Sequence, residues 1–103
     1  MAKFKLQPSP TFKSKVAIPI PGGRDEQIEF TFKRRDRQGI QDFAKGLEGK
    51  PFEEIVMECA AGWDLEEPFD AEHVKELVDN YIGSGEAVLD SYMREHVKAK
   101  EKN

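Results

Sequence analysis

The chain has 103 residues and a formal net charge of −4, with 35% charged and 38% hydrophobic residues. This length suits one domain with a modest core, covering residues 1–103. No apolar run approaches the ~20 residues that cross a membrane, and the first ten residues lack the apolar segment of a secretory signal. The single cysteine, Cys59, cannot form an internal disulfide, which suits a reducing compartment. The sequence therefore predicts a soluble cytosolic domain.

Charge is distributed unevenly along the chain. Residues 1–47 carry ten Lys or Arg against five Asp or Glu, whereas residues 48–95 carry three against fourteen. Such an asymmetry can align subunits head to tail, or it can reflect the different solvated faces of a β-rich half and a helical half. The sequence leaves both interpretations open.

The N-terminal part of the chain predicts a β-hairpin. Phe4 and Leu6 lie near prolines in residues 1–10, which predicts either a short edge strand or an extended arm. Residues 12–20 and 27–33 then alternate between apolar and polar positions, across a connection rich in Pro and Gly. Two such runs around a turn-forming connection favour a hairpin with one apolar face. That face needs a cover, because an isolated hairpin is only marginally stable in water.

Two helices are predicted after the hairpin. Asp36 can cap the first, in which apolar residues recur at i, i+3, i+4 and i+7 from Ile40 to Leu47. Pro51 suits the first position of the second helix, and two glutamates follow it in the first turn, where the helix dipole favours them. We expect this second helix to end near Gly62.

The third predicted helix is the best specified. Asp70 is a natural N-cap, and Phe69 is placed for a hydrophobic staple with Val74. The apolar stripe of the helix consists of Val74, Leu77, Val78 and Tyr81. Gly83 follows where a left-handed residue would end the helix. We expect Trp63 and Phe69 to bury against this stripe.

A last helix completes the predicted fold. Ser84 can cap it, its apolar face extends to Val97, and the polar residues 98–103 are expected to fray. Together these elements predict an α+β domain. An N-terminal hairpin, with a third short edge strand as an option, packs one face against about four α-helices.

The sequence offers no catalytic or metal-binding constellation. His73 and His96, the only histidines, fall on predicted helices, where solvation and a place near a helix C-terminus account for them. Cys59 falls on an apolar stripe, as a small buried hydrophobic residue does. One cysteine and two scattered histidines do not supply a structural zinc site, and no glycine-rich phosphate-binding motif is present. We therefore predict a non-enzymatic chain without catalytic, cofactor-binding or metal-binding residues.

A basic cluster marks the end of the predicted hairpin. It consists of Lys33, Arg34, Arg35 and Arg37, which could contact phosphate groups. The net acidic chain and the lack of a helix rich in Lys and Arg argue against this use. A nucleic-acid-binding regulator using residues 33–37 is therefore kept as an alternative. The main prediction includes neither nucleic acid nor a membrane as a partner.

Four segments in collinear order carry a family resemblance: MAKFKLQPSPTFKSKVAIPIPGG, IEFTFK, GWD and PFDAEHVKELVDNYIGSGEAVLDSYMRE. In this order, and over nearly the whole chain, the sequence resembles the phage tail assembly chaperones of long-tailed bacteriophages. No single short motif is diagnostic. Ile82 and Gly83 depart from the family pattern, in which a proline is expected after the asparagine–tyrosine pair.

The resemblance implies a protein that acts in the host cell cytoplasm during tail assembly and is absent from the mature virion. It implies binding to the long, apolar tape measure protein, which is kept soluble, and help in recruiting the major tail protein. Many such families also make a longer form by ribosomal frameshifting. The main alternative is a small structural tail component that stays in the virion.

Five residues are the predicted contacts with protein partners, further copies of the chain included. They are Phe4, Leu6, Phe12, Arg34 and Arg35. An apolar arm and a hairpin edge can add to a neighbouring chain, and the opposed charges of the two halves favour head-to-tail packing. The competing interpretation is that Phe4, Leu6 and Phe12 complete the core of the domain itself.

Overall fold

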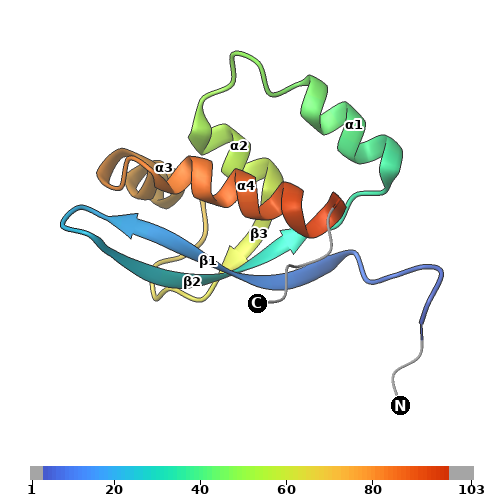
Figure 1. Ribbon diagram of the computed structural model, residues 1–103, viewed down its shortest axis with the longest axis horizontal. Coiled ribbons are helices and arrows are strands. Elements are labelled where there is room, and N and C mark those ends of the chain that lie inside the picture. The colour runs from blue at the N-terminus through green and yellow to red at the C-terminus, as the bar shows by residue number, and fades with distance from the viewer. Residues whose placement is uncertain (1–3, 98–103) are drawn as a thin grey trace.

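The computed structural model describes residues 4–97, which form a three-stranded antiparallel sheet with helices over one face (Figure 1). The elements in chain order are β1 (Thr11–Ile20), β2 (Arg24–Lys33), α1 (Arg37–Lys45), α2 (Phe52–Cys59), β3 (Ala60–Trp63), α3 (Ala71–Asn80) and α4 (Ser84–Val97). The predicted α+β class, with a hairpin against four helices, is confirmed. The expected fraying of residues 98–103 lies outside the described residues.

The hairpin has the predicted apolar face. Val16 pairs with Ile28 and Phe12 with Phe32, so the apolar residues of both strands point to the same side. That side is covered by the helices, while Lys13, Lys15 and the other alternate residues of β1 are exposed to solvent. The connection contains Gly22 and Gly23 at φ +110° and +97°, a region that residues with a Cβ rarely adopt.

The third strand comes from a different part of the chain than the one expected. Residues 4–10 form no strand, and β3 pairs with the other edge of β2, where Trp63 lies opposite Phe30. The expectation that α2 ends near Gly62 is also wrong. The helix ends at Cys59 because Ala60 adopts extended dihedral angles (φ −125°, ψ 155°), and the backbone then enters the sheet.

The structure confirms the predicted N-terminal caps of α1 and α3, but not the predicted left-handed residue at Gly83. The carboxylates of Asp36 and Asp70 accept hydrogen bonds from the N–H groups of Gly39 (2.8 Å) and His73 (2.9 Å), as predicted. Gly83, however, is not left-handed. A Cβ at this position would lie 3.1 Å from Pro19 Cγ, so close approach to β1 favours glycine here.

Ser84 has a different role from the predicted cap. It is fully buried, and its hydroxyl group donates to the carbonyl oxygen of Leu77 (3.3 Å). The side chain therefore joins the start of α4 to the last turns of α3.

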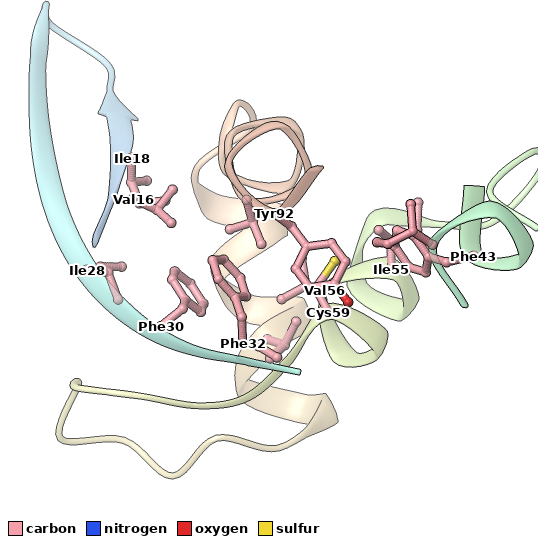
Figure 2. Packing of buried hydrophobic residues seen from close by; sticks show 14 residues of the cluster. Val16, Ile18, Ile28, Phe30, Phe32, Phe43, Ile55, Val56, Cys59 and Tyr92 are labelled. Atoms are coloured by element: carbon pink, nitrogen blue, oxygen red, sulfur yellow. The ribbon is translucent and has the colours of Figure 1, made fainter. Parts of the chain in front are cut away.

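The core lies between the sheet and the helices (Figure 2). Tyr92 of α4 is fully buried there, with its ring 5.3 Å from the rings of both Phe32 and Phe43, measured between centroids. Trp63 and Phe69 pack edge to face at 5.1 Å and are half-buried, at the margin of this core. Among residues 4–97, no helix has the length and apolar character needed to cross a membrane.

Candidate protein-interaction surface

The most exposed apolar side chains lie on the segment before β1, residues 4–10, here called the arm. Phe4 is 91% exposed and Leu6 is 90% exposed. The arm extends away from the domain and is tied to it where the N–H of Arg34 donates to the carbonyl oxygen of Pro10 (2.8 Å; Figure 1). The interpretation that Phe4 and Leu6 complete the core is therefore wrong. Their predicted contact with a partner stays a prediction.

Phe12 belongs to the margin of the core. Its ring centroid lies 5.6 Å from that of Phe32 and 5.3 Å from that of His96. It is half-buried, so it anchors the start of β1 against α4 and offers a partner only its remaining edge.

Arg35 points into the domain, although a charged residue in a basic run is expected to face solvent. Its Nη1 donates to the carbonyl oxygen of Glu58 (2.9 Å) and to the hydroxyl oxygen of Tyr92. The guanidinium carbon lies 4.8 Å from the ring centroid of Phe43, a cation–π contact. These contacts tie the end of β2 to α1, α2 and α4, and they engage Nη1 and the face of a guanidinium that was predicted to meet a partner.

The rest of the basic cluster is also engaged in part. Lys33 Nζ donates to the carbonyl oxygen of Met57 (3.2 Å). Arg34 is half-buried, and its Nε is buried without a hydrogen-bond partner among residues 4–97. Arg37 alone of the four residues has both an exposed side chain and no such contact within the described part of the chain. The cluster therefore does not present the continuous basic row that suits a nucleic acid.

His96 closes the network around Tyr92. Its Nε2 accepts from the N–H of Arg35 (3.1 Å), so the ring proton lies on Nδ1, which donates to the carbonyl oxygen of Tyr92 (2.9 Å). The hydroxyl group of Tyr92 donates to the carbonyl oxygen of Lys33 (2.7 Å). Burial raises the pKa of this hydroxyl, and Arg35 partly opposes that effect. The structural role expected for His96 near a helix end agrees with this geometry.

A groove of about 180 Å³ lies between α3 and the segment that connects it to β3. Four apolar or aromatic side chains line it: Trp63, Leu65, Leu77 and Tyr81. The polar residues of the lining are Glu67, His73, Glu76 and Asn80, so the groove also carries two carboxylates. The indole N–H of Trp63 donates to the carbonyl oxygen of Glu67 (2.7 Å), which fixes the connecting segment. Pockets that bind drug-sized ligands have volumes of about 300–1,000 Å³, so this groove is better sized for one or two side chains.

The remaining reactive groups have structural surroundings. Cys59 is fully buried, and burial raises the pKa of its thiol to about 12, so it stays protonated at neutral pH. Within residues 4–97, no group of three or more His, Cys, Asp or Glu side chains is placed to hold a metal ion.

Comparison with known proteins identifies the family. A family model described as phage tail assembly chaperone matches residues 1–103, the whole chain. No curated protein and no solved structure matches the chain. Because the family match spans the hairpin, all four helices, the arm and the groove, the chain belongs to the phage tail assembly chaperone family.

Proposed function

We propose that the chain is a non-enzymatic chaperone that binds the tape measure protein, keeps it soluble and helps recruit the major tail protein. It acts in the host cytoplasm during assembly and is absent from the finished virion. The observation that carries the proposal is the family match over all 103 residues.

The surface of the domain supports a role in holding other proteins. Phe4 and Leu6 are left out of the domain's own core, and adjoining exposed apolar side chains that form a patch are a common feature of contact sites. β1 and β3 are the two edge strands of the sheet, and such edges can accept a further strand. Phe12 and Arg34 adjoin the base of the arm, and Arg35 supports this region from inside the domain.

Co-expression with the tape measure protein of the same phage tests the proposal. We expect the tape measure protein to sediment when expressed alone, and to stay in the supernatant and co-purify when the chaperone is present. An unrelated folded protein of similar size is the control. A tape measure protein that stays soluble alone, or that never co-purifies, would contradict the proposal.

Mass spectrometry of purified virions separates the chaperone from a structural tail component. A chaperone is expected to be present in infected cells and absent from the particles. Stoichiometric recovery of the chain from purified particles would favour the structural alternative.

A further inference from the structure

We propose that the arm of one copy binds in the groove of a second copy, and that repetition of this contact joins copies head to tail. The arm comprises residues 4–10, and the groove is lined by Trp63, Leu65, Leu77 and Tyr81. The inference goes beyond the chaperone proposal, because it requires no tape measure protein.

The arm has apolar side chains that nothing in the described chain covers. Phe4 and Leu6 are 91% and 90% exposed. The free arm bends at Leu6 and Gln7. Binding in an extended form would place Phe4 and Leu6 on one side and Lys5 on the other, because side chains two positions apart in an extended segment point to the same side. An arm of this kind needs a concave apolar surface with acidic groups around it.

The groove provides those two properties. Half of its lining residues are apolar or aromatic, and one of them, Leu65, remains 37% exposed. Glu67 and Glu76 also line the groove and are both exposed, so they can meet the ammonium group of Lys5. Complementary charge steers association and fixes the orientation of the partners. Apolar character and charge therefore both match between the two surfaces.

The two surfaces lie in different parts of the domain, which favours a contact between copies. The arm joins the domain at Pro10, beside Arg34 at the C-terminal end of β2, and extends outward from there (Figure 1). Tyr81 lines the groove. Two residues later, Gly83 packs close to Pro19, at the other end of β1. Trp63, which also lines the groove, is separated from β1 by β2, since Phe30 pairs with Ser14 on one side and with Trp63 on the other.

A contact between unlike surfaces leaves one arm and one groove free on every pair. Such a heterologous contact continues into an open chain of copies unless the rotation closes a ring. One arrangement thus covers both exposed surfaces, and it can place many copies along an extended client.

Two variants separate the surfaces. The arm variant carries Phe4→Ser and Leu6→Ser, and the groove variant carries Leu65→Lys and Glu76→Lys. Val97→Ser and Glu48→Lys, which alter exposed residues outside both surfaces, are the matched controls. Circular dichroism and thermal melting establish that each variant is folded.

Sedimentation velocity over a hundredfold concentration range gives the readout, with no other protein present. We expect the native chain and the controls to form species larger than two copies, and each variant alone to stay monomeric. An equimolar mixture of the two variants should stop at two copies. The reason is that the mixture offers only one intact arm and one intact groove to each pair.

Any of three outcomes would overturn the inference: a native chain that stays monomeric, a variant that still associates as the native chain does, or a mixture of variants that forms no pairs. These results are independent of the chaperone proposal. A chain that associates through arm and groove but leaves the tape measure protein insoluble keeps this inference and loses the proposed function.

Discussion

At the scale of single residues, the hydroxyl group of Tyr92 holds together the end of β2 and two helices. It donates to the carbonyl oxygen of Lys33 and accepts from Arg35, which also donates to α2. Tyr92→Phe keeps the buried ring but leaves these groups without their partner. We expect the free energy of unfolding, measured by urea denaturation, to fall by about 1–3 kcal/mol.

Tyr81→Phe is the matched control, because Tyr81 is half-buried and its hydroxyl makes no such bridge within the described residues. Its effect should stay within about 0.5 kcal/mol. Equal decreases in the free energy of unfolding for the two variants would contradict the bridging role that the geometry assigns to the Tyr92 hydroxyl group.

Gly85 is a second residue whose identity is set by its neighbour. It is buried in the first turn of α4, where a Cβ would lie 2.6 Å from Cβ of Phe52. Alanine favours a helix over glycine by about 1 kcal/mol, but overpacking costs typically 1–3 kcal/mol. Since Phe52 Cβ moves only with α2, we expect Gly85→Ala to lower the free energy of unfolding in urea.

Gly46→Ala is the control, because a Cβ there would meet only ordinary contacts, the nearest at 3.6 Å. It should be close to neutral. A Gly85→Ala chain more stable than the native one would mean that α2 and α4 can separate at little cost.

At the scale of elements, the start of α3 links stability to pH. His73 Nδ1 lies 2.8 Å from the carboxylate of Asp70. This contact raises the pKa of His73 above 6.5, while hydrogen bonds from His73, first from its backbone N–H, hold the pKa of Asp70 below 3.8. The His73 contribution is complete below pH 6.5 and is lost as pH rises through the folded-state value. The Asp70 contribution is present above pH 3.8 and is lost as pH falls.

The pair therefore stabilises α3 most between those two limits. We expect His73→Gln to lower stability most between pH 3.8 and 6.5, and the difference from the native chain to shrink as pH rises through the raised folded-state pKa of His73. Urea denaturation at each pH measures the difference, and an NMR titration of the imidazole reports its pKa. Asp70→Asn keeps a capping side chain but removes the charge, so it should return the His73 pKa towards 6.5. An unchanged pKa in that variant would contradict the assignment.

Periodicity made most elements predictable, whereas long-range contacts did not show in the sequence. The hairpin and the apolar stripes follow from spacing alone. β3 was missed because Ala60–Trp63 continues from α2 without a turn and becomes a strand only by pairing with β2. Gly83 was misread for a similar reason, since Pro19 lies far away in the sequence.

The arm and the groove also differ in whether they could be predicted from the sequence. The arm could be found from the sequence, because apolar residues beside prolines stand outside any regular apolar stripe. The groove could not, because Trp63 and Tyr81 look like core residues until their partial exposure is known. The inward turn of Arg35 also depends on Tyr92 and Phe43, which the sequence places in other elements.

At the scale of the whole molecule, the uneven distribution of charge along the sequence can be related to surfaces of the folded domain. The exposed face of the hairpin carries Lys13, Lys15 and Lys33 together with Asp25 and Glu29, and Lys5 adds positive charge on the arm. The lining of the groove on α3 includes Glu67 and Glu76. A head-to-tail contact brings the basic N-terminal part of one copy near the acidic part of the next. Salt should therefore weaken association between copies, since interactions between exposed charges are largely screened beyond about 10 Å at 0.1 M ionic strength, and over shorter distances at higher salt.

Deletion of residues 2–9 tests whether folding and association are separate properties of the chain. The deletion removes Phe4 and Leu6 but retains Pro10, whose carbonyl oxygen holds Arg34. The described residues it removes are exposed, so the melting temperature should shift by less than the ~4 °C that about 1 kcal/mol produces in a domain of this size. Association should be lost at the same time. A large fall in melting temperature would place the arm in the core, whereas unchanged association would mean that copies meet through another surface, such as the free edge of β1.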